Sequence, residues 1–287
     1  MKKWLVGWML MYIFPVLAQN PASYKIYTKN GKKTTWKKLI KKAAKADVVF
    51  FGEEHNNAVA HWLELKLTED LYRLKDGKII LGAEMFERDN QQAVTDYVEG
   101  KINAKQLDSL ARLWPNFERD YKPLLDFARE HHLPFIATNI PRRYASMVYK
   151  KGFESLDSLS AEEKKWVAPL PVAYDPELSQ YKKMVEMMGG HGHGGENLPK
   201  AQAVKDATMA YSIAQNLKPG YTFIHFNGSY HSAFDQGILW YLRRLKPDVK
   251  ILTVETVSQK DITRLDDEHK GTADFIIVVD NSFPKSY

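Results

Sequence analysis

Six short hydrophobic segments recur along the chain, and each is a continuous run rather than an alternation of apolar and polar residues. Continuous runs of about four to eight residues, rich in Val, Ile and Phe, are typical of strands that are buried on both faces. Because helical patterns separate these runs, the sequence predicts an α/β fold with a mostly parallel sheet flanked by helices. The predicted strands are Asp47–Phe51, Lys78–Gly82, Pro134–Thr138, Tyr221–Phe226, Lys250–Thr253 and Asp274–Val279.

The segment that follows the first predicted strand has the pattern of an amphipathic helix. Within residues 58–74, the hydrophobic residues Trp62, Leu65, Leu71 and Leu74 lie among charged residues at helical spacing. A parallel sheet needs a crossover connection between its strands, and a helix usually provides it. We therefore expect one crossover helix here, with these four side chains facing the sheet.

Two gaps between predicted strands are longer than a simple crossover needs. They comprise about residues 84–134 and 139–221, and both have helical patterning. The second gap predicts a smaller helical cap subdomain, inserted at about residues 140–218, above the ends of the strands. Within it, Ser160 followed three positions later by Glu163 has the pattern of a capping box at a helix start.

The N-terminal segment has the pattern of a cleavable signal peptide. Two lysines precede a largely apolar run, Trp4–Leu17, and small residues stand where a signal peptidase would cleave after Ala18. The run is shorter than the roughly 20 residues of a membrane-spanning helix, although an uncleaved anchor is the alternative. We expect residues 1–18 to be removed, which leaves 19–287 as one α/β domain in the periplasm or secreted.

Cysteine is absent from the chain. The protein therefore offers no thiol for a lipid anchor, a disulfide or a metal site. An exported form is accordingly not expected to be a lipoprotein. Any bound metal would be held by nitrogen and oxygen atoms, with methionine sulfur as a weak further ligand.

Positive charge is concentrated in one segment near the N-terminus. Nine lysines and no acidic residue lie within Lys25–Lys45. Trp36, Leu39, Ile40 and Ala43 recur there at helical spacing, which predicts an amphipathic helix with lysines on its outer face. A solvated face is the simplest interpretation, and a membrane-surface contact is the alternative. Nucleic acid is not expected as a partner, because aromatic and basic residues do not interleave in this segment.

Polar residues that can carry chemistry follow several of the predicted strands. Ligands of open α/β sheets bind at the carboxyl ends of the strands. Glu53 and His55 follow the first predicted strand, Glu84 follows the second, and His231 follows the fourth. Carboxylates and imidazoles at neighbouring strand ends can hold a divalent metal or act as general acids and bases. An ordinary role as helix caps or polar loop residues is the alternative, and it is preferred for Asn56 and Asn57.

These segments together resemble the ChaN-like haem-binding proteins, some of which are called iron-regulated, in a superfamily with Tiki proteases and erythromycin esterases. The resemblance extends over about residues 47–235 and rests on the order of short motifs, each weak alone. These motifs are Gly52–His55, Gly82–Glu87 with Gln91, Trp114 with Tyr121–Ala128, Thr138–Arg142, Ala201–Ala210 and Gly228–His231. The resemblance implies an α/β sheet with a helical subdomain, export, and haem binding in at least some members.

Haem needs an apolar slot, an axial ligand and preferably cations near its propionates. The predicted cap offers tyrosines and a glycine-rich segment with two histidines, and the third strand end offers two arginines. The residues that we expect to contact haem are Tyr174, Tyr181, His191, His193, Arg142 and Arg143. The resemblance implies a tyrosine as axial ligand without placing it on one position. The two histidines are either ligands or simply solvated.

Two classes of function follow. The first is an exported protein that binds haem or an iron complex, in haem or iron uptake. The second is a metal-dependent hydrolase of the esterase or peptidase kind, in which Glu53, His55, Glu84 and His231 bind a divalent metal or act directly. A scaffold at the membrane surface ranks last, and a homodimer is left open. The chain has neither a serine-nucleophile elbow nor a P-loop for a nucleotide.

Overall fold

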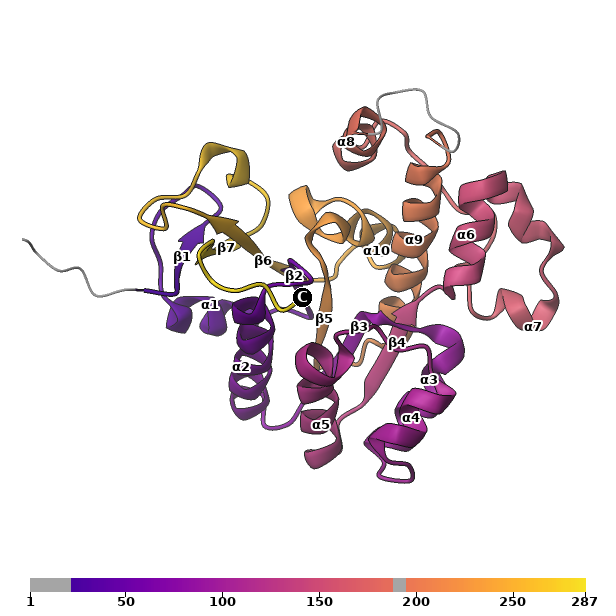
Figure 1. Ribbon diagram of the computed structural model, residues 1–287, viewed down its shortest axis with the longest axis horizontal. Helices are drawn as coiled ribbons and strands as arrows, with labels where there is room; N and C mark the ends of the chain where they lie inside the picture. The colour runs from indigo at the N-terminus through magenta and orange to yellow at the C-terminus, as the bar shows by residue number, and fades with distance from the viewer. Residues whose placement is uncertain (1–21, 188–194) are drawn as a thin grey trace, which may run out of the picture.

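A seven-stranded sheet forms the centre of the protein (Figure 1). The computed structural model describes residues 22–187 and 195–287. The strand order is β1-β7-β6-β2-β5-β3-β4, in which β1 is antiparallel to β7 and the other neighbours are parallel. The strands are β1 (Tyr24–Thr28), β2 (Val48–Glu53), β3 (Ile79–Glu87), β4 (Phe135–Asn139), β5 (Thr222–Gly228), β6 (Ile251–Gln259) and β7 (Phe275–Asp280). The predicted α/β class and all six predicted strands are confirmed.

The edge strand β1 was not predicted, because it lies in the lysine-rich segment and has a weak hydrophobic pattern. Only its third and fourth residues, Ile26 and Tyr27, are buried. Short strands that carry lysine are common at sheet edges, where they discourage pairing with another chain. The helix predicted in the same segment is confirmed as α1 (Trp36–Ala43), which buries Leu39 and Ile40 and begins at the cap residue Thr35.

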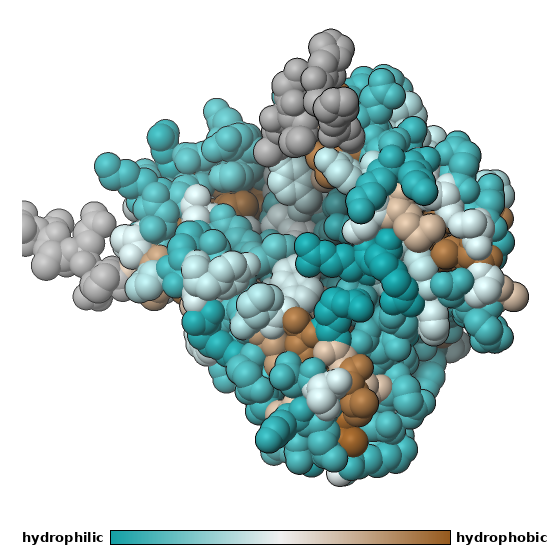
Figure 2. Space-filling view, turned by 45° about the vertical axis from the view of Figure 1, so that its right-hand side comes forward, coloured by the Kyte–Doolittle hydropathy of each residue, from teal (hydrophilic) through white to brown (hydrophobic). Residues whose placement is uncertain are grey.

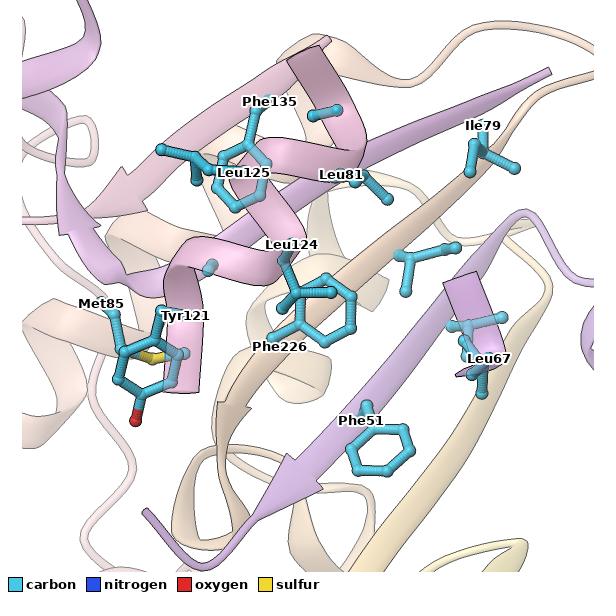
Figure 3. Packing of buried hydrophobic residues seen from close by; sticks show 14 of the residues in the cluster. Phe51, Leu67, Ile79, Leu81, Met85, Tyr121, Leu124, Leu125, Phe135 and Phe226 are labelled. Carbon is cyan, nitrogen blue, oxygen red and sulfur yellow. The ribbon is translucent and has the colours of Figure 1, made fainter. Parts of the chain in front are cut away.

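One face of the sheet is covered by helices from the first half of the chain. These helices are α1, α2 (Ala58–Leu74), α3 (Gln91–Val98), α4 (Ala104–Leu110) and α5 (Lys122–Glu130). Side chains alternate between the two faces of a strand, so Phe51 and Phe226 point to this side, where they meet Leu67 of α2 and Leu124 of α5 (Figure 3). This layer forms the largest hydrophobic cluster among the described residues.

The other face is covered by α9 (Leu198–Asn216) and α10 (Ile238–Leu245). Phe50 and Phe223 of the sheet pack here against Met209 and Ile213 of α9 and Leu242 of α10. Figure 1 shows these two helices on the opposite side of the sheet from α2 and α5. The central strands are therefore buried on both faces, as their continuous hydrophobic runs predict.

Two further helices, α6 (Arg142–Lys151) and α8 (Ser179–Met187), pack against α9, and α7 (Ala161–Lys164) lies beyond α6 (Figure 1). Tyr144 and Val148 of α6 join Val204 of α9 in a separate small cluster. The predicted helix start at Ser160 is confirmed, since Ser160 and Glu163 form a reciprocal capping box. Helix α9 therefore packs against α6 and α8 as well as against the sheet.

The bounds predicted for α2 are correct, but two of its four predicted core positions are wrong. Trp62 is 49% exposed and Leu74 is 58% exposed. The buried side of α2 instead includes the polar residues His61 and Glu64. A hydrophobicity pattern assigns polar residues to the solvent side. It therefore predicted the wrong face of α2 to be buried.

The surface of the described residues is mainly hydrophilic on the face seen in Figure 2, and hydrophobic residues are exposed there in small separate groups. No helix within the described ranges has the length and apolar character needed to cross a membrane.

Candidate functional site

A cavity of about 880 Å³ opens at the carboxyl ends of the parallel strands, where the fold class predicts a site. Its floor includes Glu53 of β2, Glu84 of β3, Gly228 of β5 and Glu255 of β6. Its walls come from α8, α9 and the loop that contains Trp114. A volume of this size is typical of small-molecule and cofactor sites, which span roughly 300–1,000 Å³.

The predicted residues Glu53 and His55 form a directly hydrogen-bonded pair. Glu53 Oε1 lies 2.7 Å from His55 Nδ1 and accepts a second hydrogen bond of 2.7 Å from the hydroxyl of Tyr121. In Figure 3 this hydroxyl points away from the apolar side chains around the Tyr121 ring. The His55 side chain is 34% exposed and packs edge-on against Trp114, with ring centroids 4.8 Å apart. With Nδ1 held by Glu53, Nε2 is the nitrogen that His55 offers to the cavity.

The charge states of this pair follow from its surroundings. Burial alone would raise the pKa of Glu53, but hydrogen bonds from His55 and His61 outweigh it and lower that pKa. Burial alone would lower the pKa of His55, whereas the bond to Glu53 and the charge of Glu84 raise it. Glu53 is therefore an ionised acceptor, and the Nδ1 atom of His55 carries the hydrogen between them.

The predicted residues Glu84 and His231 belong to a second network. Glu84 Oε1 lies 3.1 Å from His231 Nε2, and Glu84 Oε2 accepts a 2.8 Å hydrogen bond from the backbone N–H of Gly228. The other ring nitrogen of His231 pairs with Asp206 in the middle of α9. Asp206 in turn accepts a 2.9 Å hydrogen bond from the hydroxyl of Tyr181. A continuous chain of polar contacts thus links α8, α9 and β3 beneath the cavity.

This second network carries a fixed charge pair near neutral pH. Burial disfavours the charged form of His231, but Glu84 and Asp206 outweigh it and raise its pKa to about 9. Burial likewise opposes ionisation of Glu84, yet His231 lowers the pKa of that carboxyl to about 2. Both ring nitrogens of His231 are engaged, so its imidazolium stabilises the carboxylates on either side.

A third group of ionisable residues, which the sequence did not reveal, lies on the α2 side of Glu53. His61 Nδ1 is 3.3 Å from Glu53 Oε2 and 3.2 Å from Glu64 Oε2. His61 Nε2 lies 3.0 Å from the backbone carbonyl oxygen of His55. The available signal was the pair of polar residues three positions apart in α2, because such residues share a helix face.

Glu255 is a further cavity residue that the sequence did not indicate. The predicted strand ended at Thr253, whereas β6 continues to Gln259. Glu255 is 7% exposed, and its Oε2 atom has no hydrogen-bond partner. Burial raises the pKa of this carboxyl to about 7. Glu255 can therefore gain or lose a proton near neutral pH.

Of the described residues predicted to contact haem, Arg142 alone lines this cavity. Arg143 instead pairs with Asp89 and lies over the Tyr144 ring, 4.4 Å from the centroid. Tyr174 and Tyr181 stack on each other with centroids 5.7 Å apart and do not line the cavity. The hydroxyl of Tyr181 is already engaged by Asp206. The predicted residues His191 and His193 lie outside the described residues.

Two solved structures are similar to this chain to different degrees. ChaN of Campylobacter jejuni, whose structure is described as binding haem cofacially, gives a TM-score of 0.69 at 17% identity, over 90% of this chain and 97% of that chain. A mutant of the erythromycin esterase EreC in its open conformation gives a TM-score of 0.47 at 11% identity, over 78% of this chain and 72% of that chain. At 17% identity, the likeness to ChaN shows a shared fold.

Sequence comparisons give the family. RETICULATA-RELATED 5, a chloroplastic protein of Arabidopsis thaliana, is 23% identical over 202 residues, which are 66% of this chain and 27% of that protein. This chain thus matches about a quarter of that relative's length. Residues 39–242 match the family described as haem-binding uptake, Tiki superfamily, ChaN. Since the matched segment is more than half of the chain, the protein belongs to the ChaN family of the Tiki superfamily.

Proposed function

We propose that the protein binds haem in the cavity at the strand ends, with His55 as the axial ligand. The observation that carries this proposal is the Glu53–His55 pair, in which a carboxylate holds Nδ1 and leaves Nε2 for a ligand. This arrangement fixes the orientation of a metal-binding imidazole and increases its basicity. Bound haem would supply an iron atom that takes such a nitrogen ligand.

Other residues of the cavity suit the rest of a haem molecule. Trp114, Ile140 and Met184 provide apolar surface for the porphyrin, while Arg142 and Lys205 offer cations for the propionates. Tyr181 is a poorer axial ligand than His55, because its hydroxyl is buried and donates to Asp206. The family description and the likeness to ChaN support the same ligand class.

A haemin titration tests this proposal. We expect the wild-type protein to sharpen and shift the Soret band at near-stoichiometric haemin, and His55→Ala to raise the dissociation constant at least tenfold. His132→Asn is the matched control, since His132 is exposed and precedes β4 at the opposite end of the strands. An unchanged wild-type spectrum would contradict haem binding, and equal affinities in wild type and His55→Ala would contradict the role of His55.

The function in haem or iron uptake also requires export, which we propose from the pattern of residues 1–18. The mature protein would begin at Gln19 and carry no lipid. Mass spectrometry of the protein from the producing cells measures this directly. A retained N-terminus in the cell membrane would support the uncleaved anchor instead.

A hydrolase is the second candidate function, and Glu255 is the observation that favours it. Its pKa of about 7 suits a proton carrier in the same cavity as the Glu84–His231 pair. Hydrolysis of ester and peptide substrates that is lost in Glu255→Gln, with or without added divalent metal, would support this candidate. Activity independent of Glu255 would exclude the role, and haem binding through His55 would be unaffected.

A further inference from the structure

A buried cluster of one imidazole and two carboxylates lies beside the cavity floor. Glu53 contributes from the end of β2, and His61 and Glu64 contribute from the first two turns of α2. One donor atom from each residue lies within 4.8 Å of the others. The three side chains are at most 5% exposed. Such groups are rarely buried together without a cation to neutralise them.

The hydrogen bonds around His61 define which ring nitrogen faces the carboxylates. A backbone carbonyl can only accept a hydrogen bond, so the 3.0 Å contact between Nε2 and the carbonyl oxygen of His55 places a hydrogen on Nε2. A metal ion would displace the proton from Nδ1, and the Nδ1 lone pair would then face Glu53 and Glu64. Histidines that bind metals commonly donate their other N–H to a backbone carbonyl in this way.

The two carboxylates are incompletely satisfied within the described part of the chain. Glu64 Oε1 is buried without a hydrogen-bond partner, and Glu53 Oε2 is buried with His61 Nδ1 at 3.3 Å as an ion-pair contact. The hydroxyl of Thr68 does not relieve Glu64, because it donates to the backbone oxygen of that residue. Glu53 Oε1 is held from outside the cluster by His55 and Tyr121, which orient Oε2 toward His61.

The donor separations match a small metal ion. The distances from His61 Nδ1 to the two carboxylates are 3.3 and 3.2 Å. Donors that share a tetrahedral zinc ion at about 2.0–2.1 Å are roughly 3.4 Å apart. Two carboxylates and a neutral imidazole would also make the occupied site electrically neutral.

We propose that Glu53, His61 and Glu64 bind one divalent cation that prefers nitrogen and oxygen ligands, with zinc as the best fit. This site shares Glu53 with the proposed haem ligand pair but is otherwise distinct. It also differs from the metal site expected from the sequence, whose donors pair as Glu53 with His55 and Glu84 with His231. The proposal does not depend on haem binding.

Metal analysis of the full chain tests the site. We expect the protein, purified without chelator and dialysed against Zn²⁺, to retain one zinc ion per chain and to lose thermal stability when the ion is removed. Glu64→Gln keeps the size of the side chain and removes one charged ligand, so it should weaken zinc binding at least tenfold. Glu69→Gln is the control on the same helix, where Glu69 pairs with Lys66 outside the cluster.

Two further measurements make the test decisive if the variant folds poorly and distinguish zinc binding from haem binding. Co²⁺ in place of zinc should give visible absorption bands in the wild type that reveal nitrogen and oxygen ligation, even if Glu64→Gln folds poorly. Haemin titration of Glu64→Gln should still give the wild-type Soret change, which separates this site from haem binding. Absence of bound Zn²⁺ in the wild type would overturn the proposal, and so would equal zinc affinity in wild type and Glu64→Gln.

Discussion

Gly228 is the residue at which the two carboxylate–imidazole networks meet. Its N–H donates to Glu84, and a Cβ atom at this position would lie only 2.8 Å from Cε1 and Nε2 of His55. The backbone angles of Gly228, φ −57° and ψ 141°, are open to any residue. The glycine is therefore required by the close approach of His55 and not by backbone conformation.

Substitution of Gly228 by alanine tests this contact. We expect Gly228→Ala to lower the free energy of unfolding by about 1–3 kcal/mol through overpacking and to weaken haem binding by displacing His55. The double variant Gly228→Ala/His55→Ala should be more stable than the sum of the single effects, because the clash is gone. Chemical denaturation of the four proteins measures this, and strict additivity would show that the two residues do not interact.

His225 makes stability depend on pH. It is fully buried in β5, where Nδ1 donates to Asn227 and Nε2 lies 2.9 Å from the Thr138 hydroxyl oxygen. Burial lowers its pKa to about 4, whereas the unfolded chain has the ordinary value of about 6.5. Between these values the unfolded state binds more protons, so stability is complete above about pH 6.5 and falls as pH decreases toward 4.

The expected contribution of His225 is about 3 kcal/mol across that interval. We expect the unfolding free energy of His225→Gln to fall less steeply than that of the wild type between pH 6.5 and 4, whatever its absolute stability. Urea denaturation at several pH values gives both slopes. Parallel curves for the two proteins would contradict the assignment.

At the scale of single residues, the sequence indicated several residues of the cavity but not the hydrogen bonds and ion pairs that connect them. Glu53, His55 and Glu84 were found because each lies at or just after a predicted strand. Asp206 and His61 were not predicted as site residues. Each lies within a helix, and the orientation of that helix decides whether the side chain is buried. Helix rotation depends on packing against the rest of the fold, which hydrophobic periodicity describes poorly when the buried face is polar.

Among the elements, α2 links the strand end to the buried acidic cluster. Asn57 begins the helix, and its side-chain oxygen accepts hydrogen bonds of 3.1 Å from the N–H groups of Val59 and Ala60. The capping role expected for Asn57 is thus confirmed. Its side-chain nitrogen also donates to Glu54 and Ser258, which ties the start of the helix to β6.

Removal of the cap should loosen the first turn of α2. We expect Asn57→Ala to lower the free energy of unfolding by about 1–2 kcal/mol, and Asn57→Asp to lower it less because its carboxylate can still cap. Thermal denaturation compares the two variants. An alanine variant as stable as the aspartate variant would show that the cap contributes little.

For the whole molecule, the lysines of α1 are the main unassigned surface feature. Lys37, Lys38, Lys41 and Lys42 are exposed, which fits both a solvated face and a membrane contact. A lysine near an anionic membrane contributes about 1 kcal/mol of binding. We expect weak sedimentation with anionic vesicles at low salt, loss at high salt, and no sedimentation with neutral vesicles. If replacement of all four lysines by glutamate left vesicle binding unchanged, the membrane contact would lie on another part of the surface.

The overall architecture was more predictable than the details of the helices. Buried parallel strands give long hydrophobic runs that are hard to confuse with other elements, so β2 to β7 were all recognised. The lysine-rich β1 and the exposed Trp62 show where the pattern fails, because edge strands and helix surfaces tolerate either kind of residue. Tertiary contacts alone decide such positions.

The pairing of β1 with β7 also sets an order of events during synthesis. Tyr24 pairs with Val279, so the first strand of the sheet waits for almost the last one to be made. At about 5–20 residues per second, that delay is roughly 10–50 s. The central strand β2 likewise waits for β5 and β6. The sheet therefore cannot be completed until synthesis is almost finished, and such a late-folding chain is compatible with the export that we propose.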